Sequence, residues 1–416
     1  MPDRFTGEFR QLSFYTRSPR KSITCAVSIQ MRINKTFSFS PFLVVGHTIN
    51  DMFSNLLSGL LPVLTVAFGL SYMLAGLVAM VNSITSSILQ PLVGRWFDRR
   101  QTIWLLEAGL TLNCIGMSLV GIAPSYIVLL FLVATAGLGS AAFHPPAFST
   151  VVKSSSTSRG RTMGIFLSGG NAGFFLGPIM AGTVVSVSGL PGTLLLLPIG
   201  LLIAILLFKV RLRKDDENVA PADTDQSANK RLVGLLATIT AFRSIAIQSA
   251  VTFLPLYLVT KGDSLFIATT IASIWLGVGV LGQLGGGFIS DRIGRRPVIA
   301  SSLLAGGLLF YAFLITTGVL SLLLLVVSGI LLYASWSVIV VMSSEAAPSN
   351  VGAVSGLMLG FSVGIGGVSA LGFGAVADML GLHSAFLLFI GFALAGGLLA
   401  LILPRHGTTS NVTILN

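Results

Sequence analysis

Charged residues are scarce in this 416-residue chain, where Asp, Glu, Lys and Arg together make up 9%. A soluble domain is usually about 25% charged, so the low content excludes an ordinary soluble protein. Hydrophobic residues make up 53% of the chain, and its mean hydropathy is +0.90. These values predict a protein whose helices cross a membrane several times.

Cysteine is nearly absent as well. Cys25 and Cys114 are too few for a disulfide framework or a thiolate metal centre. The sequence has no phosphate-binding P-loop motif, so we expect an ion gradient rather than ATP as the energy source, and no cofactor or metal. The net charge of +11 does not predict nucleic-acid binding, because the positive residues lie between apolar segments rather than among aromatics.

The apolar residues gather in twelve segments, each near the roughly 20 residues that a helix needs to span a bilayer. They predict an all-α membrane protein of twelve transmembrane helices arranged as two pseudo-symmetric six-helix bundles. We divide the chain into a disordered basic tail (1–36), two bundles (37–209 and 231–404), a cytoplasmic linker (210–230) and a C-terminal tail (405–416). The spans lie at about 39–66, 72–93, 102–122, 125–151, 161–187, 190–209, 231–259, 265–289, 297–316, 319–344, 350–376 and 381–403.

Lys and Arg fall on one side of this arrangement. All 25 of them except Arg243 and Lys261 lie in the two tails or in the links that follow even-numbered spans. Short cytoplasmic links are enriched in Lys and Arg. The pattern therefore predicts that both termini face the cytoplasm.

The two halves of the chain repeat each other with a shift of 193 residues (255 minus 62). Such repeats are typical of secondary transporters, whose substrate site lies between the halves near the bilayer midplane. On this register Asn50 corresponds to Arg243, which places Asp51 and Arg243 at near-equivalent depths. The matching pairs are Pro62 with Pro255, Gln90 with Gln283, Gly94 with Gly287 and Asp98 with Asp291.

The first span carries an acid where the bilayer disfavours charge. His47, Asp51 and Asn55 are four residues apart, so they share one helix face. Ionisable residues inside a membrane usually mark a substrate, ion or proton pathway. We interpret Asp51, with His47, as a proton carrier. The alternative is a carboxylate permanently capped by His47 or by a neighbouring helix.

Arg243 places a permanent cation about midway along the seventh span. A guanidinium binds phosphate-like groups with two parallel hydrogen bonds, so Arg243 is a candidate for binding an anionic substrate. The alternative is a structural salt bridge to Asp51 across the two halves. Asn55, Asn171 and Gln248 are further candidates for substrate binding.

Several motifs resemble those of a known family. The stretch from Gly287 to Arg296, G-x-x-x-D-R-x-G-R-R, resembles the cytoplasmic loop signature of the major facilitator superfamily, and Gly94 to Gln101 keeps part of it. The stretch from Gly173 to Gly182 resembles the G-x-x-x-G-P motif of drug:proton antiporters. HTINDMFSNLLSGLLPVL, GLGSAAFHPPA and SGGNAGFFLGP resemble the fosmidomycin-resistance family within that superfamily.

This resemblance implies a proton-coupled exporter of a drug or small organic anion, such as a fosmidomycin-like phosphonate, in the bacterial inner membrane. Its partners would be the small-molecule substrate, protons and lipid, and we expect a monomer and no enzyme activity. One alternative is a symporter or uniporter that imports an organic anion. The other is a membrane-embedded enzyme or channel, but an enzyme would need several ionisable groups converging at one level.

His144, in the fourth span, is a further proton-coupling candidate, because histidine titrates near neutral pH. The alternative is a ring that bonds a backbone carbonyl freed by Pro145 and Pro146. The resemblance implies an acid just after this His-Pro pair, whereas this chain has Pro146 there. The chain would then couple protons differently from its relatives, or through Asp51 alone.

Two further groups of residues are assigned by analogy with the superfamily. The loop acids can cap helix N-termini in the opposite half, and the loop arginines can pair with acids such as Glu345, so these contacts could gate the cytoplasmic side. The glycine motif of the fifth span could let that helix bend and approach a neighbour closely, and the alternative is ordinary helix packing. The gating candidates are Gly94, Asp98, Arg99, Gly287, Asp291, Arg292, Arg295 and Glu345, and the bending candidates are Gly173, Gly177, Pro178 and Gly182.

Overall fold

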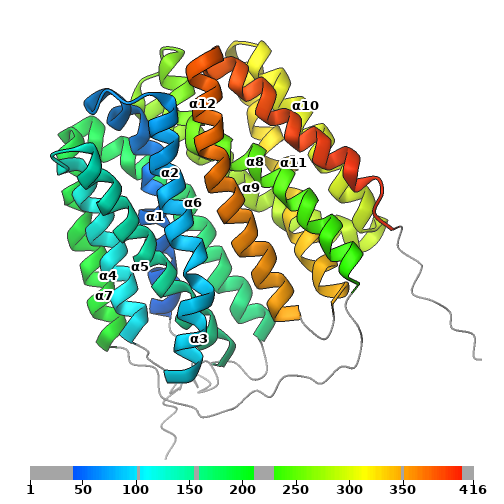
Figure 1. Cartoon of the computed structure of the whole chain (residues 1–416), viewed down its shortest axis with the longest axis horizontal. Coiled ribbons are helices and arrows are strands. Elements are labelled where there is room, and N and C mark those ends of the chain that lie inside the picture. Colours follow the sequence, from blue (N-terminus) through cyan, green and yellow to red (C-terminus); the bar gives the residue numbers. More distant parts are fainter. Residues whose placement is uncertain (1–40, 101–103, 154–158, 210–228, 348–350, 405–416) are drawn as a thin grey trace, which may run out of the picture. The chain divides into compact units, whose positions relative to one another are not determined.

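The computed structural model of the chain describes residues 41–100, 104–153, 159–209, 229–347 and 351–404, and the elements formed in these ranges are helices (Figure 1). The predicted tails at 1–36 and 405–416 and most of the predicted linker lie outside the described residues. The division of the chain into two bundles stays a prediction.

The helices follow the predicted spans closely. The first half contains α1 (Pro41–Ala67), α2 (Tyr72–Ile88), α3 (Gln90–Arg100), α4 (Trp104–Leu119), η1 (Val120–Ile122), α5 (Tyr126–Lys153), α6 (Arg159–Ser188), η2 (Leu190–Leu196) and α7 (Leu197–Lys209). The second half contains α8 (Lys230–Thr260), α9 (Leu265–Ile293), α10 (Arg295–Ile315), α11 (Gly318–Glu345) and α12 (Val351–Ala400).

Within the described residues, 11 helices are long and apolar enough to cross a membrane, which is one fewer than the twelve predicted. The difference lies in α12, whose 50 residues contain a non-helical residue, Gly381, with φ 81° and ψ 157°. A straight helix of that length would measure about 75 Å, more than twice a hydrocarbon core of about 30 Å. Gly381 therefore divides α12 into two helical segments that are too long together for a single crossing, while the count of twelve and the cytoplasmic termini stay predictions.

The internal repeat is visible in local structure as well as in sequence. Ser71 caps the N-terminus of α2 by accepting a bond from the N–H of Leu74 at 3.3 Å, and Ser264 caps α9 in the same way at 3.3 Å. The two caps differ by the same shift (264 minus 71). Gly189, with φ 65°, ends α6 at a place that corresponds within one residue to Gly381. The break in α12 therefore repeats the break that separates α6 from η2 and α7.

The two halves meet where α2 packs along α12, α6 along α9, and α1 against α8 (Figure 1). We call the helix ends near 95–100, 209–230 and 292–296 the basic end, and the ends near 68–71, 261–264 and 378–381 the far end. At the far end, the Asp378 carboxylate on α12 accepts hydrogen bonds from the backbone N–H groups of Tyr72 (2.7 Å) and Met73 (2.9 Å). This contact joins the first turn of α2 to the other half.

Glycines along one face of α12 lie at different distances from α2, and the space around each one shows how closely the two helices approach. A Cβ on Gly374 would overlap the backbone carbonyl of Tyr72, and one on Gly367 would overlap the side chain of Ser83. A Cβ on Gly364 would lie 3.6 Å from the Ser87 hydroxyl, whereas one on Gly360 or Gly356 would meet no atom within 4 Å. Among the described residues, α12 therefore touches α2 at the far end and separates from it toward the basic end.

Candidate functional site

The α1 face predicted from sequence is buried against α6. His47 and Asp51 are 3% and 4% exposed. A Cβ on Gly170 of α6 would lie 2.7 Å from the Asp51 Oδ2 atom, and one on Gly177 would lie 2.8 Å from the Asn55 Cβ. Glycine at these positions allows α1 to pack directly against the backbone of α6, because any larger side chain would collide with α1.

The glycine motif of the fifth span packs closely against neighbouring helices. A Cβ on Gly173 would overlap the Thr48 carbonyl of α1, and one on Gly182 would overlap Thr269 of α9. The Pro178 carbonyl lies against Gly59 of α1. Helix α6 runs unbroken from Arg159 to Ser188, so the bending role of these residues stays a prediction.

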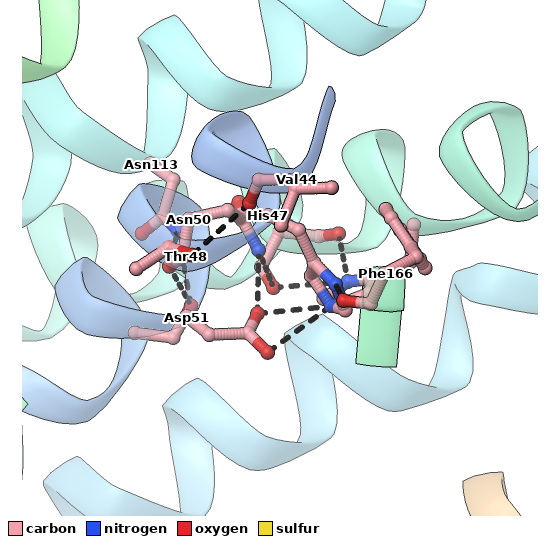
Figure 2. A network of polar contacts seen from close by, with 10 residues as sticks. Val44, His47, Thr48, Asn50, Asp51, Asn113 and Phe166 are labelled. Carbon is pink, nitrogen blue, oxygen red and sulfur yellow. Dashed lines mark hydrogen bonds and ion pairs between the residues drawn. The ribbon is translucent and has the colours of Figure 1, made fainter. Parts of the chain in front are cut away.

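The acid on α1 lies between two histidines. The Asp51 Oδ2 atom is 3.2 Å from the His47 Nε2 atom, and Oδ1 is 3.2 Å from the His144 Nε2 atom on α5 (Figure 2). The His47 ring also stacks on Phe166, with centroids 4.1 Å apart. The structure thus brings together the three residues predicted to couple protons, and we call them the His–Asp–His cluster.

Backbone carbonyls fix the proton positions of both imidazoles. The His47 Nδ1 atom lies 2.9 Å from the Phe166 carbonyl, and the His144 Nδ1 atom lies 2.8 Å from the Ser140 carbonyl. A carbonyl oxygen can only accept, so both Nδ1 atoms carry hydrogen. Both Nε2 atoms then face a carboxylate oxygen, and each contact is attractive only when a proton lies between nitrogen and oxygen.

His144 contacts both a backbone carbonyl and the acid of α1, and its role in proton coupling stays a prediction. Its Nδ1 atom bonds a backbone carbonyl, but that carbonyl belongs to Ser140 rather than to a residue whose carbonyl Pro145 or Pro146 frees. Its Nε2 atom is in contact with Asp51. The acid that relatives were expected to carry after this histidine is therefore supplied to the ring by α1.

A network of amides surrounds the cluster. The Asn50 side chain donates to the Asp51 Oδ1 atom at 3.0 Å, and Asn113 on α4 donates to the Asn50 Oδ1 atom at 3.0 Å (Figure 2). Asn113 also donates to the Ser54 hydroxyl at 3.0 Å. These residues were not predicted as site residues, although an amide inside an apolar span is a signal that could have indicated them.

His47, Asp51 and His144 form a group of described residues able to supply three ligand atoms to a metal ion, within 4.8 Å of one another. Nitrogen ligands of zinc lie about 2.0–2.1 Å from the ion, so two ligands on one ion cannot be more than about 4.2 Å apart. The cluster would have to contract to hold an ion, whereas protons fit its 3.2 Å contacts directly.

Arg243, buried on α8, is held by residues of α11. Its Nε atom donates to the Ser335 hydroxyl at 3.0 Å. The guanidinium carbon lies 4.9 Å from the ring centre of Trp336 and 5.7 Å from that of Tyr333. No sequence pattern indicated these three α11 residues, since they lie about ninety positions from Arg243 (335 minus 243) on another span.

The structural salt bridge between Asp51 and Arg243, one of the two readings of the arginine, is not formed. Within the described ranges, the ion pairs of Asp51 are with the two histidines, and no carboxylate pairs with Arg243. Asp51 contacts imidazoles of its own half, and Arg243 contacts α11 of its own half. Asp51 can therefore bind a proton, and Arg243 an anion, without first breaking an ion pair between them.

The other predicted substrate-binding residues are placed differently from one another. Asn55 is buried and donates to the Phe174 carbonyl of α6 at 2.8 Å, so its amide bonds a neighbouring helix. Gln248 is half-buried on α8 and lies beside Gly366 of α12. Asn171 is half-buried on α6. Their role in substrate binding stays a prediction.

The predicted gating residues make contacts within one half. Arg295 on α10 bonds the carboxylates of Asp291 on α9 and Glu345 on α11, the latter at 3.0 Å. The pairing of a loop arginine with Glu345 is thus present, whereas none of the contacts described for Asp291 joins it to the opposite half. Arg292 is exposed, Gly94 and Gly287 are half-buried, and the side chains of Asp98 and Arg99 lie outside those described.

Comparison with known proteins agrees with this architecture. The family model of the Major Facilitator Superfamily matches residues 43–371. The chain is 29% identical over 398 residues to the fosmidomycin resistance protein of Escherichia coli, covering 92% of this chain and 97% of that protein. It is also 29% identical over 380 residues to an uncharacterised transporter of the same superfamily from Bacillus subtilis, covering 87% and 92%.

Solved structures share the fold at low sequence identity. A bacterial homologue of the human lysosomal transporter Spinster, in an inward-facing and unoccupied conformation, has a TM-score of 0.76 at 18% identity, covering 86% of this chain and 95% of that one. A D-xylose–proton symporter has a TM-score of 0.73 at 14% identity, covering 89% and 98%.

Repeated helices that enclose buried ionisable groups define a multi-pass membrane transporter of small molecules. The chain belongs to the major facilitator superfamily, as the match over residues 43–371 shows. The relatives and structural neighbours are transporters rather than enzymes, which confirms that expectation. The resemblance noted from the motifs is confirmed as well.

Proposed function

We propose that the protein exports a drug or small organic anion in exchange for protons by alternating access, as a monomer in the bacterial inner membrane. The observation that carries this proposal is the His–Asp–His cluster, a carboxylate held between two imidazole nitrogens at 3.2 Å. Such a cluster can take up and release protons without leaving a buried charge unpaired.

Proton exchange is supported by the position of the cluster. His47 and Asp51 are buried, whereas the His144 side chain is 17% exposed and sits on another helix. A movement between α1 and α5 would separate the Asp51 and His144 contact, and the acid would then bind or lose a proton. Coupling needs this kind of change in the surroundings of one group between two states.

An anionic substrate is supported by Arg243 and by a relative. Among the described residues, Arg243 is a buried cation with no carboxylate partner, and a guanidinium suits a phosphonate or carboxylate group. A relative with 29% identity is a fosmidomycin resistance protein, and fosmidomycin is a phosphonate. Export from the cell would give such resistance.

The separation of α12 from α2 at the basic end is consistent with the state in which an exporter binds its substrate. If Lys and Arg mark the cytoplasmic side, the structure is open toward the cytoplasm and closed at the far end by Asp378. A solved neighbour in an inward-facing conformation has the same fold. In this state the substrate would enter from inside the cell.

A second candidate, a proton–anion symporter, is favoured by one observation. Because Asp51 and Arg243 do not pair, a proton and an anion need not compete for one another's site. Binding one of two opposite charges helps the other to bind, which favours transport in the same direction. Exchange would instead require that proton uptake weaken anion binding.

The experiment that separates the two candidates is transport of radiolabelled fosmidomycin in inside-out membrane vesicles. When the lumen of the vesicles is made more acidic than the medium, an exchanger accumulates the drug in the lumen as protons leave. A symporter expels the drug under the same gradient. Absence of any gradient-dependent movement of fosmidomycin or of other anionic and neutral drugs would contradict the proposal.

A further inference from the structure

The surroundings of Arg243 are unusual for a buried cation. A buried guanidinium is normally paired with a carboxylate, because an uncompensated charge is costly to bury. Here the described partners are a hydroxyl, Ser335, and two aromatic rings, Trp336 and Tyr333. All three partners lie within about one turn of α11, so one helix positions the group.

Aromatic faces stabilise a cation without neutralising it. Stacking over a ring contributes about 2 kcal/mol when the pair is desolvated, and it leaves the edge of the guanidinium free for hydrogen bonds. Within the described residues, Ser335 engages the Nε atom, and no hydrogen bond engages the two terminal nitrogens. These two nitrogens are the donors that grip an oxyanion in a bidentate manner.

The rest of the described interior sets a limit on the ligand. Arg243 is the one Lys or Arg among the described residues that is buried. A ligand with two separated oxyanion groups would have to bury its second group without a fixed cation among the described residues. Such a placement is strongly unfavourable.

We propose that Trp336 and Tyr333 are positioning residues that hold Arg243 ready for one oxyanion group, and that the transported substrate carries a single carboxylate or phosphonate. This inference rests on the proposed anionic substrate, and it narrows the class to substrates with one oxyanion group. Ser335 fixes the rotation of the guanidinium about its long axis.

The test is binding to purified wild-type protein and two Trp336 variants in detergent, without a proton gradient. The probes are fosmidomycin and methylphosphonate, each with one phosphonate, and methylenediphosphonate, with two. Trp336→Phe keeps an aromatic face and should bind fosmidomycin as the wild type does, whereas Trp336→Leu should weaken binding about ten-fold. Methylenediphosphonate should bind more weakly than methylphosphonate to the wild type.

Matched measurements keep the outcome clear. Trp104→Leu changes an exposed tryptophan and should leave binding unchanged, and thermal unfolding checks that each variant is folded. Equal binding by folded Trp336→Leu, or preference for the diphosphonate, would overturn the inference while gradient-driven transport of fosmidomycin would still support the proposed function. No binding of any phosphonate by the wild type would overturn both.

An independent observation concerns the far end. The Asp378 carboxylate bonds two free backbone N–H groups at the start of α2, at 2.7 and 2.9 Å. Helix N-termini attract negative charge, and a carboxylate bonding two N–H groups forms charge-assisted hydrogen bonds. Around this contact, Gly76 and Gly374 bring the backbones of α2 and α12 together so closely that a Cβ on either would overlap the other helix.

We infer that Asp378 is a latch that holds the far end closed while the basic end is open. Transport by alternating access requires the far end to open, and both hydrogen bonds must then break because α2 and α12 belong to different halves. The latch resembles the cytoplasmic contacts predicted for Asp98 and Asp291, but it acts at the opposite end.

The test measures opening of the far end through a cysteine placed at Ala75, which is buried where α2 meets the core of the other half. In right-side-out vesicles, a membrane-impermeant maleimide should label Ala75→Cys slowly. Adding Asp378→Ala should speed the labelling at least ten-fold, because two hydrogen bonds to a charged acceptor are lost.

Asp263→Ala removes an acid near the same end and serves as the matched control, with no change in labelling expected. A double variant with Asp378→Asn should label at an intermediate rate, because an amide oxygen keeps one acceptor. If the folded Ala75→Cys variant with Asp378→Ala labels at the same rate as the one with Asp263→Ala, the inference that Asp378 is a latch is wrong.

Discussion

Asp51 on α1 and Arg243 on α8 lie one residue apart on the repeat register, yet the two halves accommodate their charges in different ways. The acid is held by two imidazoles whose own protons are fixed by backbone carbonyls. The arginine is held by two ring faces and a hydroxyl. The first environment exchanges protons, whereas the second preserves a permanent charge. We therefore expect one half to supply the variable charge and the other the fixed charge.

The largest effect is expected from Asp51→Asn. The amide keeps the shape of the carboxyl group but cannot take up or release a proton, so proton-driven transport should fall to the background of vesicles without the protein. The measurement is gradient-driven fosmidomycin movement, with protein insertion checked by immunoblot. Asp263→Asn, in the link after α8, is the control. Full drug resistance in cells carrying Asp51→Asn would remove Asp51 from the mechanism.

Arg243→Ala should change the KM for phosphonates rather than the coupling to protons. Losing hydrogen bonds from a charged donor costs about 1.5–3 kcal/mol, or roughly a ten- to hundred-fold rise in KM for phosphonates. Arg243→Lys keeps the charge but loses the planar fork, and it should fall in between. The measurement compares KM for a phosphonate with that for a neutral drug. An equal loss for both substrates would argue for a structural role.

The two histidines sharpen the comparison, because they differ in packing. His144→Gln should lower proton-driven transport about ten-fold, the equivalent of one charge-assisted hydrogen bond, with a normal yield of folded protein. His47→Gln should lower both transport and yield, because the His47 ring stacks on Phe166 at 4.1 Å in a buried site. Transport is measured in vesicles and yield by size-exclusion chromatography. Normal transport by His144→Gln would show that His144 is only structural.

Much of the fold could be predicted from the sequence, because a bilayer constrains helices to long apolar runs. The predicted span at 265–289 corresponds to α9, Leu265–Ile293, and that at 231–259 to α8, Lys230–Thr260. The break at Gly381 lies between two predicted spans, 350–376 and 381–403, at the first residue of the second one. Polarity inside apolar runs was enough to single out Asp51 and Arg243.

Partners on other helices could not be predicted in the same way. His144 was singled out for its residue type, but its contact with Asp51 depends on how α5 packs against α1. Trp336 gave no signal at all, since a tryptophan in an apolar span is ordinary. Asp378 was not predicted, because an acid near the end of a span is usually an interfacial residue. Its contact with α2 depends on how α2 and α12 pack together.

A smaller effect is expected from Gly177→Ala on α6. The new Cβ would lie 2.8 Å from the Asn55 Cβ, and overpacking of this kind costs about 1–3 kcal/mol. The unfolding temperature should fall, and transport should fall with it because α1 carries the cluster. Gly285→Ala is the matched control, since its Cβ would meet no atom within 4 Å. Equal unfolding temperatures for the two variants would contradict the close packing of α1 on α6.

The smallest effect is expected from the ion pairs at the basic end. Arg295 bonds Asp291 and Glu345, but both acids are exposed and belong to the same half as Arg295. Exposed ion pairs contribute about 0–1 kcal/mol, so Glu345→Gln should change the unfolding temperature little. It should also leave far-end labelling of Ala75→Cys unchanged, unlike Asp378→Ala, because the contact described for the Glu345 side chain is with Arg295 of the same half. A large change in labelling would mean that Arg295 and Glu345 act on the other half after all, as gates at the basic end.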